Sequence, residues 1–322
     1  MPTFLPLRTF GRTSLRVTPL CVGCAPLGNM PETFAYDVVE NEALATLRAG
    51  FQSPINFLDT AASYGDGESE RRIGLVLREL GGLPVGFVLA SKADRDLKTG
   101  DFSGDQIKRS VERSLHLLGM TKLQIMYLHD PEHAKFEDIL AKGGAVDALM
   151  KFKEQGVIGH VGVAGGPIEL MIRYVETGMF EAVITHNRYT LLNRSANPLL
   201  DMAAKLGIAV LNAAPYGSGI LAKGPDAYPR YAYQAADSLT LERVRAMDAV
   251  CKRHKVPLAA AALQFSMIDP RITSTIVGVS KAERLAQTVE LAHAPIPAEL
   301  WAELDAVGYA IDDPEANRWT HP

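Results

Sequence analysis

Four side chains that can carry proton transfer stand at the ends of apolar runs. Asp59 and Tyr64 lie five residues apart at the end of one run, while Lys92 and His129 close the runs VGFVLASK and LQIMYLH. The 33 residues from Asp59 to Lys92 and the 37 from Lys92 to His129 suit successive strand–helix units. Because the carboxyl ends of parallel barrel strands meet at one mouth, we expect these groups to converge there. The spacing predicts an active site.

The chemistry expected of this set is proton exchange at an oxygen. The ordinary pKa of tyrosine is about 10, too high for a base at neutral pH. A cation about 4 Å away favours phenolate by about 4 kcal/mol at an effective dielectric near 20. We expect Lys92 to be that cation and to lower the pKa of Tyr64, with Asp59 keeping it charged while partly cancelling its field. His129 is expected to orient the substrate oxygen while hydride moves at the adjoining carbon.

Each of these residues also has a purely structural interpretation. Asp59 and Lys92 could form an ion pair that only supports a barrel, Tyr64 could be an exposed loop residue, and His129 a hydrogen-bonded core histidine. Their joint occurrence at consecutive strand ends favours the catalytic interpretation.

The elements that must position these residues follow an alternating pattern. Short apolar runs rich in β-branched residues favour buried parallel strands at 20–24, 56–60, 85–91, 123–129, 160–164, 182–185, 208–213 and 273–279. Helical spacing occupies 41–49, 69–80, 103–118, 145–155, 167–176, 198–206 and 281–291. Gly119, Gly156 and Gly207 follow three of these segments as helix stops. The alternation predicts a (β/α)8 TIM barrel, and a single domain over residues 1–322.

Two segments depart from even spacing. The first strand begins late, and FGRTSLRV is typical of an N-terminal β-hairpin. Between strands seven and eight lies a long loop, 217–237, followed by helical patterns at 239–254 and 257–268. A long irregular loop on the catalytic side of a barrel is often a lid. A last helix is predicted at 298–307.

Composition and charge restrict the class of protein. The 322 residues are 47% hydrophobic and 22% charged, and the net charge of −4 gives no footprint for nucleic acid or an anionic membrane. No apolar run reaches spanning length and MPTFLPLRTFGRTS lacks a signal-peptide core, so a cytoplasmic protein is expected. Cys21 and Cys24 form a C-x-x-C pair within an apolar strand, which favours buried thiols over a redox centre. Cys251 is expected to be a lone thiol, and the sequence indicates no oligomeric state.

The chain resembles the aldo-keto reductases over nearly its whole length. The resemblance rests on FGRTSLRVTPLCVGC, NFLDTAASYGDGESERRIG, VLASK, RSLHLLGMTKLQIMYLHDP, RYTLLNR and TIVGVSKAERL. It implies a (β/α)8 barrel that binds a nicotinamide cofactor across its C-terminal face, without metal. It also implies that Tyr64 is the proton donor or acceptor, that Lys92 and Asp59 tune it, and that His129 orients the substrate.

The same resemblance implies a cofactor site along the last strands. APYGSGIL is similar to the family's pyrophosphate loop, and VGVSKAERLAQT to its adenosine-phosphate segment. Barrels generally bind phosphate near strands seven and eight. The implied cofactor contacts are Asp59, His186, Asn187, Tyr216, Gly217, Ser218, Gly219, Leu221, Val279, Ser280 and Arg284.

Some positions depart from the family pattern near the nicotinamide. Ala164 and Gly165 replace a Ser-Asn pair that commonly holds the carboxamide, and His186 replaces a Gln. Ala213 stands where a ring commonly stacks on the nicotinamide, with Tyr216 three residues later. The carboxamide is therefore expected to be held differently here.

Other departures bear on the choice between NAD and NADP. Gly278 stands where relatives that prefer NADP often place a lysine, and Gln287-Thr288 replaces their Glu-Asn pair. A 2′-phosphate calls for a cation, so we expect NAD. Lys281 and Arg284 leave NADP open.

One branch of the family fits best. THNRYTLLNR, VGVAGG and AAPYGSGIL resemble the branch of aldose 1-dehydrogenases and pyridoxal dehydrogenases. This implies NAD-dependent oxidation of a cyclic aldose of the L-fucose, L-galactose or D-arabinose type at C1 to a lactone. Two other enzymatic interpretations remain, a pyridoxal 4-dehydrogenase and an NADPH-dependent aldehyde or ketone reductase, and a remote third is a cofactor-binding regulatory subunit. Beside Tyr64 and His129, the expected substrate contacts are Asn29, Met30 and Trp319.

Overall fold

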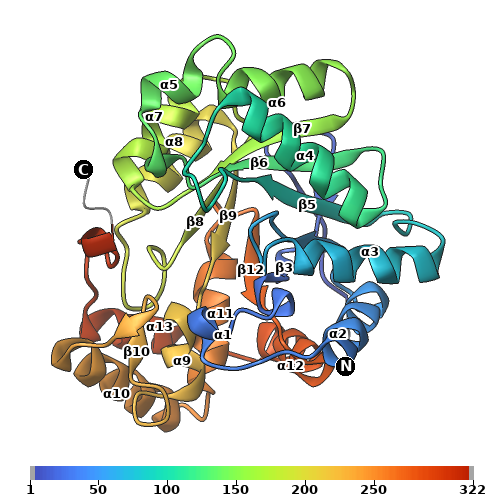
Figure 1. Cartoon of the computed structure of the whole chain (residues 1–322). Helices are drawn as coiled ribbons and strands as arrows, with labels where there is room; N and C mark the ends of the chain where they lie inside the picture. The colour runs from blue at the N-terminus through green and yellow to red at the C-terminus, as the bar shows by residue number, and fades with distance from the viewer. Residues whose placement is uncertain (1–3, 319–322) are drawn as a thin grey trace.

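Eight parallel strands close into a barrel in the computed structural model, which describes residues 4–318 (Figure 1). In barrel order they are β12 (Ser274–Gly278), β3 (Leu20–Gly23), β4 (Phe57–Asp59), β5 (Val88–Ala93), β6 (Leu123–His129), β7 (Ile158–Ala164), β8 (Ala182–His186) and β9 (Ala209–Ala213). The register pairs Gly23 with both Gly278 and Asp59, so the carboxyl ends of β12, β3 and β4 lie level. The predicted (β/α)8 barrel is confirmed.

The longer helices surround the barrel or pack beside it (Figure 1). They are α2 (Glu40–Gln52), α3 (Glu68–Leu80), α4 (Gly104–Leu118), α6 (Ala145–Glu154), α7 (Ile168–Glu176), α8 (Asn197–Leu206), α10 (Ser238–Arg253), α11 (Leu258–Ile268), α12 (Ala282–His293) and α13 (Ala298–Val307). The glycine stops act as predicted at Gly119 and Gly207, whose φ angles of 67° and 66° end α4 and α8. Gly156 also has a positive φ, but α6 ends two residues earlier.

The barrel interior is filled by alternate side chains of the strands. Phe57, Ile125 and Leu211 belong to this inner cluster, which Phe10 and Val17 of the N-terminal hairpin extend. Because the hairpin plugs the amino-terminal end of the barrel with apolar side chains, polar chemistry is left to the opposite end.

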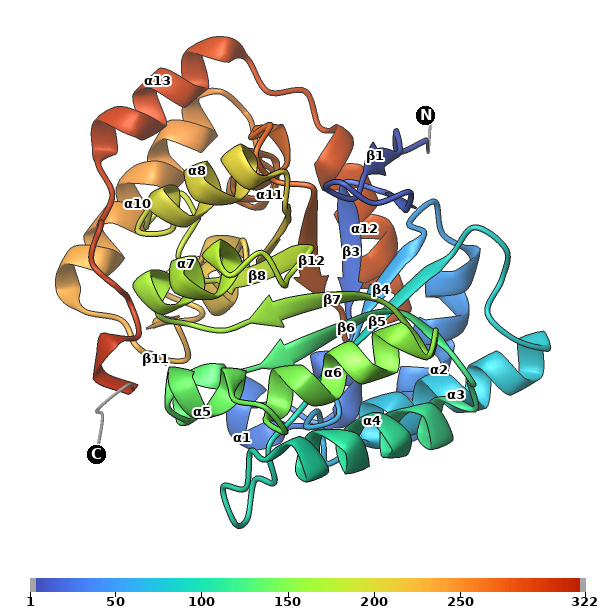
Figure 2. The ribbon, with the colours of Figure 1, turned by 90° about the horizontal axis from the view of Figure 1, so that it is seen from above.

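The N-terminal hairpin consists of β1 (Arg8–Thr9) and β2 (Arg16–Val17), paired antiparallel. The view in Figure 2 places it at one end of the barrel and α1 (Pro31–Phe34) at the other. The hairpin prediction is confirmed. The strand predicted from residue 85 is wrong at its start, because Val85 is fully exposed and the N–H of Phe87 bonds to the carbonyl of Pro84 in a turn.

The connection from β9 to β12 has more structure than the sequence predicted. The predicted helices α10 and α11 are present, but 217–237 also contains a 3-10 turn (Gly217–Gly219), α9 (Ile220–Lys223) and the hairpin β10 (Arg230–Tyr231) with β11 (Gln234–Ala235). Ile220 and Leu221 join α10, α11 and α13 in a second apolar cluster beside the barrel. A further short helix, α5 (Phe136–Leu140), and 3-10 turns at Ala25–Gly28, Pro131–His133 and Ala316–Arg318 were not predicted.

All three cysteines are buried and free. Burial raises the pKa of Cys21 and Cys24, and raises that of Cys251 to about 11. Thiols of this kind stay protonated at neutral pH, which agrees with the structural role predicted for Cys21 and Cys24.

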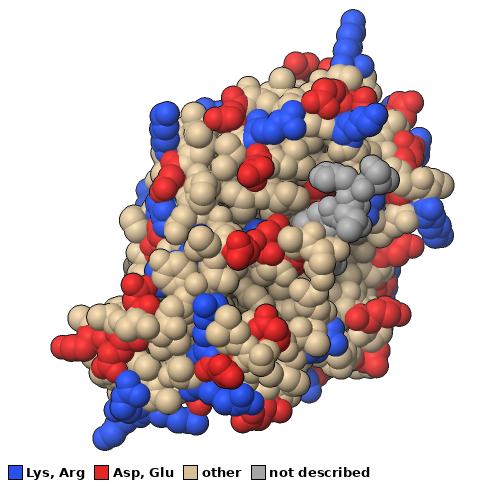
Figure 3. Space-filling view, turned by 90° about the vertical axis from the view of Figure 1, so that its left-hand side faces the viewer, with Lys and Arg blue, Asp and Glu red and all other residues tan. Residues whose placement is uncertain are grey.

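The surface carries both signs of charge. On the face shown in Figure 3, basic and acidic side chains are interspersed over most of the view. None of the helices within residues 4–318 combines the length and apolarity needed to cross a membrane.

Candidate active site

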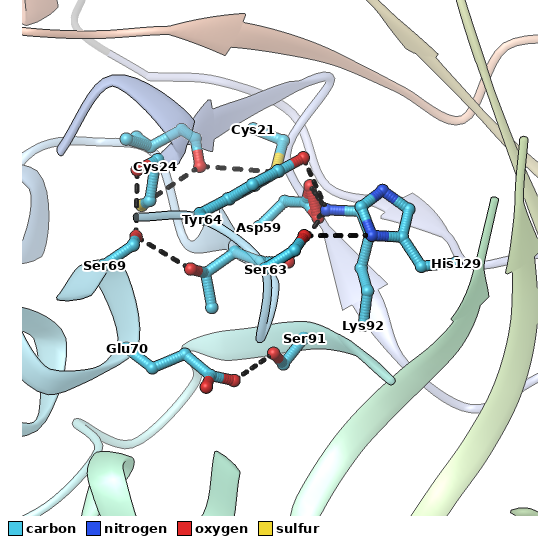
Figure 4. A network of polar contacts seen from close by, with 12 residues as sticks. Cys21, Cys24, Asp59, Ser63, Tyr64, Ser69, Glu70, Ser91, Lys92 and His129 are labelled. Carbon is cyan, nitrogen blue, oxygen red and sulfur yellow. Dashed lines mark hydrogen bonds and ion pairs between the residues drawn. The ribbon is translucent and has the colours of Figure 1, made fainter. Parts of the chain in front are cut away.

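The amino group of Lys92 lies at the centre of the predicted catalytic set (Figure 4). Its Nζ donates to both carboxylate oxygens of Asp59 at 2.5 and 2.6 Å, to the carbonyl of Thr60 at 2.8 Å and to Oη of Tyr64 at 3.1 Å. Lys92 and Asp59 are 2% and 3% exposed, so this ion pair is shielded from water. The structure thus brings together three of the four predicted residues through one ammonium.

The loop after β4 places Tyr64 over Lys92. Beyond the end of β4 the chain continues to bond with β5, because the N–H of Thr60 donates to Ala90 and that of Ala62 to Lys92. Gly65 then turns with a φ of +62°, and a Cβ at this position would lie 1.9 Å from the carbonyl oxygen of Gly28. Glycine is therefore required directly after Tyr64, which fixes the approach of the phenol.

The hydrogen bonds around Tyr64 determine where its own proton can go. Since Oη accepts from the ammonium of Lys92, the hydroxyl hydrogen has to point elsewhere, and Tyr64 lines the cavity described below. The predicted lowering of the Tyr64 pKa is wrong for this structure. Burial raises the pKa, the charge of Lys92 opposes the rise, and the charge of Asp59 adds to it. Tyr64 is accordingly held as a protonated phenol.

His129 completes the set from the end of β6. Its ring meets that of Tyr64 edge-on, with centroids 5.9 Å apart. Its Nδ1 lies 2.7 Å from Oδ1 of Asp94, a residue that is 4% exposed and also accepts the N–H of Ser63 at 2.9 Å. Burial lowers the pKa of His129, but the charges of Asp130 and Asp94 outweigh burial and raise it to about 9. The imidazole is therefore a cation at neutral pH.

Asp94 is a site residue that was not predicted from the sequence. It follows β5 two positions after Lys92, and side chains two apart on a strand share one face. The segment VLASKAD therefore contained a usable signal. Asp94 is held in place by a residue from elsewhere in the chain, because its backbone N–H donates to Ser110 Oγ of α4.

A cavity of about 1140 Å³ opens above this set at the carboxyl end of the barrel. This volume lies just above the usual range of small-molecule sites, about 300–1,000 Å³, so the cavity has room for an extended ligand. The predicted site residues that line it are Asp59, Tyr64, Lys92, His129, Met30, His186, Tyr216, Ser218, Gly219, Ser280 and Arg284. Those that do not line it are Asn29, Asn187, Gly217, Leu221 and Val279.

Two residues that do not line the cavity support the loop APYGSGIL, which is predicted to hold the pyrophosphate. Asn187 is fully buried, and its side-chain oxygen accepts from Ser218 Oγ at 3.1 Å. The N–H of Leu221 donates to the carbonyl of Tyr216, which closes the turn. Asn187 and Leu221 thus shape the loop, while Ser218 and Tyr216 line the cavity. The hydroxyl of Tyr216 is itself buried, without a hydrogen-bond partner among the described residues.

The tail after α13 supports the cavity wall at the end of β8. Glu315, which is fully buried, lies 3.2 Å from Nε2 of His186 and accepts from the side-chain amide of Asn187 at 3.0 Å. Arg188, also fully buried, pairs with Asp313 at 2.7 Å and with Glu315 at 3.4 Å. No local pattern pointed to Glu315, because Asn187 and Arg188, which bond to its carboxylate, lie more than 120 residues away.

The end of the cavity away from Tyr64, where α2, α9 and α12 form the wall, carries both cationic and acidic side chains. Lys281 pairs with Glu42 at 3.2 Å, and Arg284 donates to Gln287 at 2.8 Å. Lys223, which was not predicted, lies with its Nζ 4.3 Å from the ring centroid of Tyr228. The described chain offers Lys223 no acidic partner, so this cation can meet a phosphate.

One expected substrate contact, Asn29, does not line the cavity. Asn29 is exposed, and its side-chain oxygen accepts the N–H of Val38. Trp319 lies outside the described residues. Of the two predicted contacts within the described residues, Asn29 and Met30, Met30 stands on the cavity wall.

The fold and the site together define an oxidoreductase of barrel architecture, and comparison with known proteins identifies the family. The model of the Aldo/keto reductase family matches residues 19–308, and the chain belongs to that family. Proteins of this family use nicotinamide cofactors. The chain is 32% identical to a D-threo-aldose 1-dehydrogenase of a Pseudomonas species, over 90% of this chain and 94% of that protein.

Two other relatives and one solved structure cover nearly the whole chain. L-galactose dehydrogenase of Arabidopsis thaliana is 28% identical over 95% of both proteins, and pyridoxal 4-dehydrogenase of Microbacterium luteolum 29% over 94% of this chain and 97% of that one. An aldo-keto reductase from Bacillus halodurans superposes with a TM-score of 0.77, covering 98% of this chain and 99% of that one at 21% identity. That structure supports the fold.

Proposed function

We propose that this chain is an NAD-dependent dehydrogenase that oxidises a cyclic aldose at C1 to a lactone. One observation carries the chemistry: the Asp59-bound ammonium of Lys92 donates to Tyr64 Oη at 3.1 Å, and the rings of Tyr64 and His129 have their centroids 5.9 Å apart. The aldose substrate is supported by two relatives whose names refer to aldoses.

At the reacting oxygen, His129 orients the substrate and Tyr64 transfers the proton. His129 donates from Nε2 to the anomeric oxygen and fixes its place, while Tyr64 in its phenolate form takes the hydroxyl proton. As the proton leaves, the C1–O bond becomes a carbonyl and the C1 hydrogen departs as hydride. The nicotinamide supplies the acceptor for that hydride. Lys92 stabilises the negative charge on Tyr64 Oη throughout, because its Nζ is already hydrogen-bonded there.

The protonation state of Tyr64 determines how the rates of oxidation and reduction change with pH. Burial raises the Tyr64 pKa, so oxidation, which needs the phenolate, accelerates as pH rises. Carbonyl reduction needs the phenol and is favoured at lower pH. An oxidation rate that falls between pH 7 and 9 would contradict the assigned role of Tyr64.

One carboxylate, that of Glu42, supports NAD over NADP, against the cations of Lys223 and Arg284 in the same part of the cavity. Glu42 lines the cavity and pairs with Lys281, which leaves that lysine partly neutralised. A carboxylate near the ribose suits the free hydroxyls of NAD and repels a 2′-phosphate. Gly278 also offers no side chain there. Ser218, Tyr216, Ser280 and Arg284 are the cavity residues that we assign to the cofactor.

Initial rates of NADH and NADPH formation test the proposal directly. The substrates are L-fucose, L-galactose, D-arabinose, D-glucose and pyridoxal, each with NAD and with NADP. NAD-dependent oxidation of one of the first three, with D-glucose inert, supports the proposal. Oxidation of pyridoxal instead supports the alternative suggested by the Microbacterium relative. If NADPH reduces simple aldehydes and no sugar is oxidised, the aldose assignment fails.

A further inference from the structure

Asp130 stands on the cavity wall directly after His129 in an unusual backbone conformation. Its φ is +46°, its N–H donates to the carbonyl of Ala164 at 2.7 Å, and Pro131 follows it. Non-glycine residues with positive φ are uncommon and often lie at functional sites. The backbone of β6 and β7 therefore holds this carboxylate at a fixed place on the wall.

The carboxylate of Asp130 has unused acceptor capacity. Within residues 4–318 its one ion pair is with His129 Nε2 at 3.6 Å, longer than a hydrogen bond. The Nδ1 side of the same ring is taken by Asp94 at 2.7 Å. The Asp130 side chain is 33% exposed, so it has lost much of its contact with water. A partly desolvated carboxylate gains from a donor on a bound molecule.

We propose that Asp130 is a specificity-determining residue that accepts a hydrogen bond from the hydroxyl on the carbon next to the reacting carbon. This rests on the proposed function, in which Tyr64 and His129 hold the reacting oxygen. Nε2 of His129 and Oδ1 of Asp130 lie side by side, 3.6 Å apart, as one donor and one acceptor. Two neighbouring oxygens of a substrate match that pair, one accepting from His129 and the other donating to Asp130. The site thereby selects 2-hydroxy aldehydes and aldoses over their deoxy counterparts.

Besides recognising a substrate hydroxyl, Asp130 can act on catalysis through His129. Its charge helps to raise the pKa of His129, so removing it weakens that cation. Such an effect acts on the reacting oxygen of every substrate alike. Recognition of the neighbouring hydroxyl acts only on substrates that carry it, so the ratio of two substrates distinguishes the roles.

The test compares matched substrates in the wild-type enzyme and two variants. Asp130→Gly removes the carboxylate and adopts positive φ without strain, while Asp130→Asn keeps the shape and one acceptor oxygen. For each enzyme, kcat/KM is measured for reduction of lactaldehyde (2-hydroxypropanal) and propanal, which differ only by the hydroxyl on the carbon next to the carbonyl. Oxidation of the best aldose and its 2-deoxy analogue is measured in parallel. Asp66→Asn is the control, since Asp66 also has positive φ but lies outside the cavity and is 79% exposed.

A hydrogen bond to a charged group predicts that the wild-type enzyme prefers the 2-hydroxylated substrate by roughly 10- to 150-fold. Asp130→Gly should lower that ratio at least tenfold, Asp130→Asn by less, and Asp66→Asn not at all. A ratio unchanged in Asp130→Gly, with both substrates slowed equally, overturns the proposal and leaves Asp130 acting through His129. Equal wild-type kcat/KM values for lactaldehyde and propanal overturn it too. The aldehyde pair gives this answer even if no sugar is oxidised, so failure of the aldose assignment remains distinguishable.

Discussion

Two sides of the same cavity are built in different ways. On the β4–β6 side, Asp59, Lys92 and His129 stand on consecutive strands and bond to one another or to the loops that follow. On the β8 side, His186 and Arg188 are held by Asp313 and Glu315 of the tail. The first side depends on the barrel alone, and the second on a segment that returns from the end of the chain.

Apart from Asp130, which follows His129 and is proposed to recognise the substrate, this difference separates the chemistry of the site from its selectivity. Proton transfer requires groups held to within a few tenths of an ångström, and strand ends of a closed barrel provide that precision. Substrate selection can be changed by exchanging loops and tails without moving the strand ends. Variants on the first side should therefore affect kcat, and variants on the second side KM.

The largest effect is expected for Lys92→Met. Removing one partner of a buried ion pair leaves the Asp59 carboxylate uncompensated, which costs about 3–5 kcal/mol of unfolding free energy. Activity should fall as well, because Tyr64 loses its hydrogen-bond donor. Urea unfolding followed by circular dichroism, together with steady-state kinetics, measures both. The double variant Asp59→Asn/Lys92→Met should recover stability but not turnover, and recovery of turnover would refute the role of Lys92.

The next largest effect is expected for Tyr64→Phe. Loss of the group that exchanges the proton should lower kcat by about 10²- to 10⁴-fold, the usual contribution of general acid–base catalysis. Cofactor affinity, followed by fluorescence titration, should stay near that of the wild type. Turnover within threefold of the wild type would exclude Tyr64 as the proton-transfer residue.

A smaller, pH-dependent effect is expected for Asp94→Asn. The pKa of His129 is raised from 6.5 to about 9, so the interactions of its cation stabilise the fold fully below pH 6.5 and are lost as pH rises through 9. The variant should be less stable than the wild type by about 2 kcal/mol at pH 6, and the gap should close above pH 9. Unfolding at several pH values, with an NMR titration of His129, checks this. A gap that is constant with pH would show that Asp94 acts through packing.

The smallest effect on catalysis is expected on the other side of the cavity, for Glu315→Gln. The amide keeps the shape of the side chain but no longer neutralises Arg188 and no longer offers a carboxylate to Nε2 of His186. KM should rise by about tenfold, as for one weakened charged hydrogen bond, while kcat changes by less than about threefold. A fall in kcat with KM unchanged would break the proposed division between the two sides.

The parts of the site that could be predicted lie close to strand ends. Asp59, Lys92 and His129 were found because a buried apolar run that ends in a polar residue is typical of a strand that reaches the mouth of a parallel barrel. Asp94 was within reach of the same reasoning, two positions beyond Lys92. The direction of the Tyr64 pKa was not, because it depends on how completely the phenol is buried, and burial outweighs the nearby ammonium.

Local pattern thus determined the barrel, its hairpin and the position of the proposed catalytic residues at the strand ends, since strand periodicity and helix stops act over a few residues. Only the tertiary structure decided that His186 would be held by Glu315, that Asn187 would turn away from the cavity, and that the Asp130 carboxylate would stand beside His129 Nε2. These contacts join segments that are distant in sequence, or depend on one backbone angle. These contacts are decided only in the folded chain, because a buried charge pairs with whichever opposite charge or polar group the packing places near it.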